Sequence, residues 1–244
     1  MTFSVDNLPD RSVNAPERGK PPAEGSLGLR TLRSSLYHVF ARLLAFPDDT
    51  LAEDLQSGEI LRPLSDAVTA LSLAGEDAPA SALIDLVRRL GKTMQLMTEK
   101  DDLTNRYWES FESPLGRRVY LIESYYRTWT ADPTSESPIA GRQGFLMSDH
   151  ALHMQGLLAL AGMTVPPGFE GRPDHLSLEL EFMSLLCRDA AREAQAQFFG
   201  DHLTWVKEAG AAVEETAIDD LYLMVIRTLM SFLETERKGL GLSH

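Results

Sequence analysis

The sequence predicts an all-α protein, a single helical domain of roughly eight to ten helices. Apolar residues recur at steps of three and four over most of the chain after residue 28, which is the period of an amphipathic helix. The alternating pattern of strands is nearly absent, and no segment repeats. The chain has 244 residues, 43% of them hydrophobic, which is enough for one sizeable core.

The first 28 residues are expected to form a disordered tail, and residues 29–244 the helical domain. The tail is rich in proline, glycine and charge and has no apolar run, so it reads as neither a signal peptide nor a packed element. No later run approaches the ~20 apolar residues that cross a bilayer. These patterns favour a cytoplasmic protein without stable membrane insertion.

In the first half of the chain, Leu32, Leu36 and Phe40 begin a helical pattern that ends at Phe46-Pro47. Asp48 or Asp49 can then cap a short helix. Further helices are expected over residues 58–73 and 79–98, and from Asp101 or Asp102 to Pro114-Leu115-Gly116.

In the second half, residues 117–130 fit a helix or a strand equally well. Residues 131–148 are expected to form an internal loop or hinge, because Asp132-Pro133 and Ser137-Pro138 break both periods. Helices are then expected over residues 149–162, as a long segment that starts at Pro173-Asp174, and over residues 200–214 and 217–237.

The charge and motif content restricts the function. The chain has 36 acidic and 23 basic residues, a net charge of −13, which disfavours nucleic acid and anionic membranes as partners. The single cysteine, Cys187, excludes an internal disulfide and a CxxC motif. Neither a glycine-rich phosphate loop nor a GxSxG elbow is present. We therefore expect no cofactor and no enzymatic activity.

The segment GRPDHLSLELEFM over residues 171–183 places polar residues within an apolar helix. Pro173 and Asp174 suit a helix start, where Asp174 can accept an orphan backbone N–H. Helical spacing puts Glu179 inside the apolar arc, so we expect a buried carboxylate paired with His175, an arginine or backbone N–H groups. Glu179 could simply lock two helices together. Alternatively, Asp174 and His175 could contribute to a binding site at the exposed mouth of this helix.

Aromatic residues concentrate in one stretch of about two dozen residues, at Tyr107, Trp108, Phe111, Tyr120, Tyr125, Tyr126 and Trp129. They could form core, or they could line a groove for an apolar peptide. Glu109, Glu112 and Glu123 interleave with them. An acidic rim around an apolar groove suits a ligand that is basic at one end and apolar at the other.

Three blocks together resemble the TorD/DmsD/NarJ family of redox-enzyme maturation proteins, which are cytoplasmic chaperones of molybdenum enzymes. They are LRSSLYHVFARLLAFPDDTLAEDL from Leu32, LTNRYWESFESPLGRRVYLIESYY from Leu103, and the PDH-containing segment described above. The last is similar to the most specific signature of the family.

The resemblance implies an all-helical, TorD-like chaperone. It would bind the twin-arginine signal peptide of a molybdopterin oxidoreductase catalytic subunit, assist cofactor insertion and prevent premature export. Matching by position implies a peptide-binding region that comprises Tyr107, Trp108, Phe111, Pro114, Glu123, Ser124, Tyr126, Pro173, Asp174 and His175.

Two other classes of function stay open. One is a helical metal-dependent hydrolase that uses His150, His153, His175 and Glu179. The other is a purely structural subunit of a larger assembly. The chain could also form a homodimer by exchanging helices across residues 131–144.

Overall fold

The computed structural model describes residues 24–73, 84, 88, 91–92, 100–113, 118–216 and 218–242. Within these residues every regular element is helical, so the predicted all-α fold class is confirmed. The α-helices are α1 Glu24–Leu44, α2 Asp49–Ser57, α3 Arg62–Leu73, α5 Lys100–Tyr107, α6 Glu123–Tyr126, α7 Asp149–Leu160, α8 Leu176–Asp189, α9 Arg192–His202, α10 Val206–Glu215 and α11 Asp220–Gly239. A 3₁₀ turn covers Glu59–Leu61 and a π-helical turn covers Trp108–Glu112.

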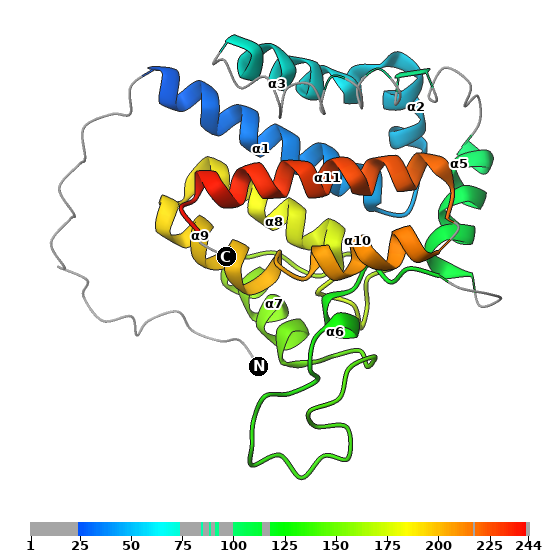
Figure 1. The fold of residues 1–244 in the computed structure, drawn as a ribbon, viewed down its shortest axis with the longest axis vertical. Coiled ribbons are helices and arrows are strands. Elements are labelled where there is room, and N and C mark those ends of the chain that lie inside the picture. Colours follow the sequence, from blue (N-terminus) through cyan, green and yellow to red (C-terminus); the bar gives the residue numbers. More distant parts are fainter. Residues whose placement is uncertain are drawn as a thin grey trace, which may run out of the picture.

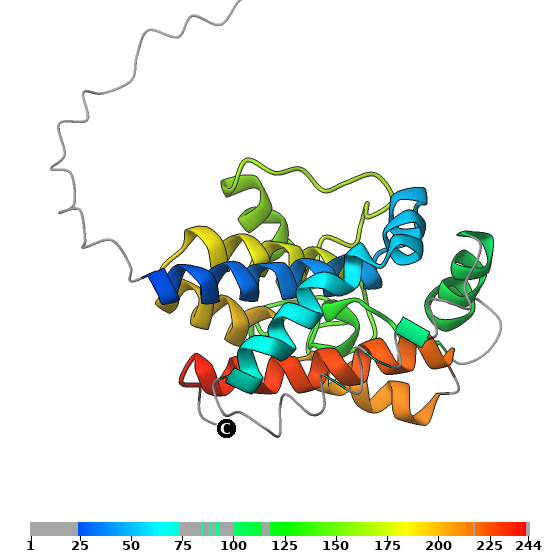
Figure 2. The same cartoon turned by 90° about the horizontal axis from the view of Figure 1, so that it is seen from above.

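The long helices α1, α8 and α11 lie side by side and enclose the core (Figures 1 and 2). Helix α1 packs along α8, α9 follows along α8, and α10 lies against α11. Apolar side chains of these helices and of α7 form one buried cluster, which includes Tyr37, Met154, Leu180, Trp205 and Leu229. Within the described residues, no helix has the length and apolar content required to span a bilayer.

Capping residues set the helix boundaries. Asp48 accepts a hydrogen bond from Leu51 N at 2.7 Å at the start of α2, which confirms that prediction, and Gly58 ends the helix with φ of 75°. Ser148 and Asp219 cap α7 and α11 in the same way. Each cap satisfies a backbone donor that the helix itself leaves unpaired.

Two contacts fix the long helices against each other. A Cβ at Gly210 would clash with the end of the Met230 side chain, so glycine leaves room for this side chain where α10 packs against α11. Arg33 of α1 donates to both carboxylate oxygens of Glu236 of α11 and, at 2.8 Å, to Gln195 of α9. The bidentate pair is almost buried and joins α1 to α11, and the bond to Gln195 adds α9.

Several expected boundaries differ from the structure. Helix α1 begins at Glu24, within the segment expected to be tail, while residues 1–23 and nearly all of the expected helix over 79–98 lie outside the described residues. We expected one long helix followed by a helix over residues 200–214. In the structure the helical backbone is interrupted at Ala190, between α8 and α9, and again at Leu203–Trp205, between α9 and α10. Neither interruption contains a glycine or a proline, so the sequence pattern did not predict these two helix ends.

The segment that fits a helix or a strand equally well contains only the short helix α6, with extended backbone before and after it. Residues 131–148 contain turns and no helix, and they project away from the helices in Figure 1. The base of this loop is held by backbone bonds from Trp129 N to Arg142 O at 2.8 Å and from Gly144 N to Tyr125 O at 3.0 Å.

Candidate functional site

Three helices, α6, α7 and α8, begin at one buried point. The backbone before α6 pairs with the backbone before α8, since Leu176 N donates to Leu121 O at 2.8 Å and Glu123 N donates to Asp174 O at 3.0 Å. This pairing brings the expected Glu123-Ser124 and Asp174-His175 positions together from opposite sides of the internal loop. We call the residues Glu123, Ser124, Ser148, Asp174, His175 and Glu179 the helix-start junction.

Asp174 caps α6 and not α8, which corrects the sequence prediction. Its Oδ2 accepts from Ser124 N at 2.7 Å and from Ser124 Oγ, and the residue is fully buried. Ser124 Oγ also lies 2.8 Å from the hydroxyl of Ser148, the cap of α7. The carboxyl group of Asp174 and the hydroxyl of Ser124 therefore link the starts of α6 and α7.

His175 is the residue that caps α8. Its Nδ1 accepts from Ser177 N at 3.2 Å, while the ring packs edge-on against Phe169. Only 2% of the residue is exposed, so the expectation of an exposed helix mouth at Asp174 and His175 is wrong. Burial lowers the pKa of His175 to about 3, with a smaller contribution from Arg172, and the imidazole is neutral near pH 7.

Glu179 is fully buried, as expected from its place in the apolar arc. Its Oε2 accepts a hydrogen bond from the indole Nε1 of Trp205 at 2.9 Å, a partner that the sequence did not indicate. Burial raises the pKa of Glu179 well above its usual range, and the nearby charges of Glu123 and Asp174 raise it further. Its Oε1 has no hydrogen-bond partner among the described residues.

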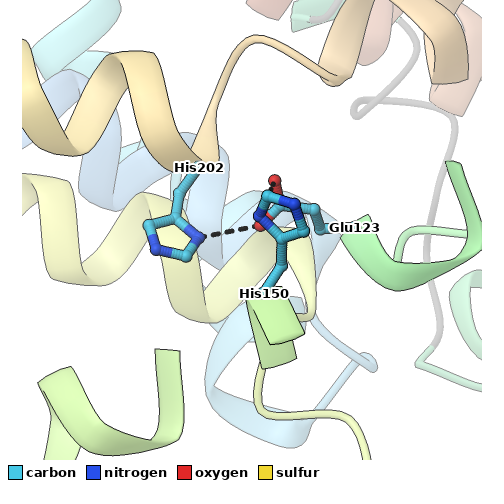
Figure 3. Close-up of side chains that lie close together, drawn as sticks. All are labelled: Glu123, His150 and His202. Atoms are coloured by element: carbon cyan, nitrogen blue, oxygen red, sulfur yellow. Dashed lines mark hydrogen bonds and ion pairs between the residues drawn. The ribbon is translucent and has the colours of Figure 1, made fainter. Parts of the chain in front are cut away.

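The histidines expected for a metal-dependent hydrolase do not converge. His175 bonds Ser177 and Glu179 bonds Trp205, whereas His153 contacts His202. A different set lies together in the part of the chain that the structure describes: one ligand atom from each of Glu123, His150 and His202, all within 4.8 Å of one another (Figure 3).

The expected aromatic residues divide between core and surface. Tyr107 and Phe111 are buried and pack edge-to-face against each other and against Tyr222. Trp108 is 49% exposed on the π-helical turn, and Tyr126 is half-buried against Trp205. Pro114 lies outside the described residues.

A cavity of about 150 Å³ opens beside the junction. Its wall combines the aromatic segment with the start of α8, and it comprises Phe111, Glu112, Arg118, Tyr120, Leu121, Ile122, Leu146, Arg172 and His175. Glu112 accepts from Arg172 at 2.7 Å, and Arg118 lies over the ring of Tyr120 at 4.5 Å. The wall of the cavity therefore combines apolar side chains with polar groups that can hold a ligand in one orientation.

Three residues at this site were not indicated by any sequence pattern. Ser148 sits at a helix start after a loop, and His202 and Trp205 lie near the break between α9 and α10. Each is a single residue in an ordinary helical pattern, and only the three-dimensional arrangement brings it to Ser124, Glu123 or Glu179.

The fold and the site define an all-helical protein with a small apolar cavity beside three linked helix starts. A family model described as the nitrate reductase delta subunit matches residues 76–210, which is more than half of the chain. The chain belongs to this family, and the resemblance to the NarJ-type maturation proteins is thereby confirmed. Membership supports a role as a maturation chaperone of molybdoenzymes.

Among solved structures, the chain is similar to a crystal structure from Archaeoglobus fulgidus of a protein assigned to the redox enzyme maturation proteins. The two share 18% identity over 82% of this chain and 93% of that chain, with a TM-score of 0.44. No match was found among curated protein sequences.

Proposed function

We propose that the protein is a cytoplasmic chaperone that binds the twin-arginine signal peptide of a molybdopterin oxidoreductase catalytic subunit. By holding the peptide, it prevents export of the subunit and assists cofactor insertion. The observation that carries this proposal is the cavity, which unites Phe111 of the aromatic segment with His175 of the PDH segment.

The size of the cavity sets how much of a peptide it can take. Pockets that enclose whole small ligands measure roughly 300–1,000 Å³, and this cavity has about 150 Å³. It therefore suits one or two apolar side chains of a peptide that otherwise lies across the surface. Affinity comes from that buried anchor, as at other interfaces where few residues supply most of the binding energy.

The charges suit the basic end of such a peptide. The chain carries a net charge of −13, and Glu112 provides a carboxylate at the cavity wall. Glu112 forms an ion pair with Arg172, and an arginine of the peptide would replace Arg172 in this pair. Since both side chains of this pair are partly exposed, the exchange changes little free energy and serves orientation and association rate.

The proposal extends to the body of the catalytic subunit as a partner, with residues 131–148 as a hinge. Residues 131–148 and the cavity meet at Leu146, so movement of the loop would change the cavity wall. Homodimerisation by exchange of helices across this loop stays a prediction.

Calorimetric titration with a synthetic twin-arginine signal peptide tests the proposal. Leu146 is 44% exposed and lines the cavity, so Leu146→Asp should weaken binding at least tenfold without loss of the helical circular-dichroism signal. The matched control is Leu160→Asp, because Leu160 is 87% exposed at the end of α7 and does not line the cavity.

Affinity of the Leu160→Asp variant should equal that of the wild type. The proposal is overturned if the wild type binds no such peptide, or if the two variants weaken binding equally.

A further inference from the structure

Three side chains that can bind a metal converge from three helices at Glu123, a member of the helix-start junction. Glu123 comes from α6, His150 from α7 and His202 from the end of α9, and Figure 3 shows both imidazoles directed at the Glu123 carboxylate. His202 Nδ1 lies 2.8 Å from Glu123 Oε2, and His150 Nδ1 lies 3.4 Å from Glu123 Oε1.

These separations are close to those of ligands around one metal ion. Zinc binds imidazole nitrogen and carboxylate oxygen at about 2.0–2.2 Å, so tetrahedral ligand atoms lie roughly 3.3 Å apart. All three ligand atoms lie within 4.8 Å of one another, so shifts of side-chain torsions suffice to close the set.

A fourth residue orients the buried histidine. His153, one turn after His150 on α7, places its Nδ1 2.9 Å from His202 Nε2, and the two rings stack. Metal-bound histidines regularly use their second nitrogen for such a hydrogen bond, which fixes the ring and the tautomer. With Nδ1 of His202 on the ion, its Nε2–H would donate to His153.

The three ligand side chains differ in burial, and His150 is the one that solvent reaches. Glu123 and His202 are fully buried, whereas the side chain of His150 is 36% exposed. The nearest cationic side chain at Glu123 is Arg127, whose Nε lies at 3.4 Å from Oε1. The side chain of Arg127 is 25% exposed and also donates to Thr204. It can therefore move away from the Glu123 carboxylate and still keep a hydrogen-bond partner.

We propose that Glu123, His150 and His202 form a binding site for a divalent first-row transition metal ion, with His153 as a positioning residue. Two imidazoles and one carboxylate without a thiolate suit Zn²⁺, Co²⁺, Ni²⁺ or Fe²⁺ better than Mg²⁺ or Ca²⁺. Three protein ligands leave a coordination position for water. Bound metal would link α6, α7 and α9.

The test uses the full chain without an affinity tag, stripped with a chelator and dialysed against ZnCl₂. Metal content per chain is measured by mass spectrometry across a range of free Zn²⁺. We expect one zinc ion per chain and an upward shift of the melting temperature. His150→Ala should weaken binding at least a hundredfold and His153→Ala about tenfold.

The matched control is His38→Ala. His38 is a half-exposed histidine that also contacts a carboxylate, Glu181 at 2.6 Å, but it belongs to no set of three ligands in the described residues. Zinc affinity of this variant should stay at the wild-type value. Absence of bound zinc, or equal affinity of His150→Ala and the wild type, would overturn the proposal.

Should His150→Ala lose helical circular dichroism, the wild type supplies a second readout. His150 is accessible to diethyl pyrocarbonate, and saturating Zn²⁺ should block its modification while His38 still reacts. Modification of His150 at the same rate with and without Zn²⁺ would also overturn the proposal.

Discussion

The helix-start junction and the cavity wall touch, but they are built differently. At the junction Asp174, His175 and Glu179 are buried, and each accepts a hydrogen bond from another element or from the start of its own helix. At the cavity wall Leu146 is 44% exposed, and Glu112 belongs to a partly exposed ion pair. The contrast indicates that the PDH segment mainly holds the scaffold, and it is the adjoining wall that we propose as the surface for a partner.

The largest expected effect concerns Asp174. Asp174→Ala removes the acceptor of Ser124 N and Ser124 Oγ inside the protein and should lower the free energy of unfolding by about 3 kcal/mol. Leu146→Ala, at the cavity wall, should cost about 1 kcal/mol or less, since this side chain is already 44% exposed. Urea denaturation followed by circular dichroism measures both values. Equal losses at the two positions would remove the distinction between scaffold and docking surface.

A smaller effect follows from the pKa of His175, which burial lowers from 6.5 to about 3. Below pH 6.5 His175 binds a proton in the unfolded chain but not in the folded protein. The stability that the neutral, buried His175 contributes is therefore complete above pH 6.5 and declines as the pH falls towards 3. Between pH 7 and pH 5 the decline is about 2 kcal/mol.

His175→Asn keeps a good helix cap and cannot titrate in this range. The stability of the wild type relative to this variant should therefore fall by about 2 kcal/mol between pH 7 and pH 5. The raised pKa values of Asp174 and Glu179 make stability increase as the pH falls, which is the opposite direction. Both proteins share this contribution, so it cancels in the difference between them. A difference that does not change with pH would show that His175 is charged or exposed in the folded protein.

The sequence was sufficient for the fold class and for the burial of Glu179, because both follow from periodicity. It also placed Asp174 at a helix start, but at the wrong one. A capping residue is recognised by its position before its own helix, whereas Asp174 caps α6, some 50 residues earlier in the chain. Such a contact between distant segments leaves no local pattern.

The same reason explains what was missed. The metal-site hypothesis from the sequence grouped His150 and His153 with His175 and Glu179, yet the other two members of the cluster, Glu123 and His202, come from α6 and α9. Trp205 became the partner of Glu179 only through the break between α9 and α10. The sequence could rank single residues, but their convergence depends on how α6 to α9 pack.

Photo-cross-linking tests the central proposal, docking of a signal peptide at the cavity, most directly. A twin-arginine peptide that carries benzoylphenylalanine in its apolar region is irradiated with the full chain, and the adducts are mapped by mass spectrometry. We predict adducts at Phe111, Tyr120 or Leu146, which line the cavity, and their loss when unlabelled peptide competes. Adducts confined to α1 or α11, with none at the cavity wall, would contradict the account.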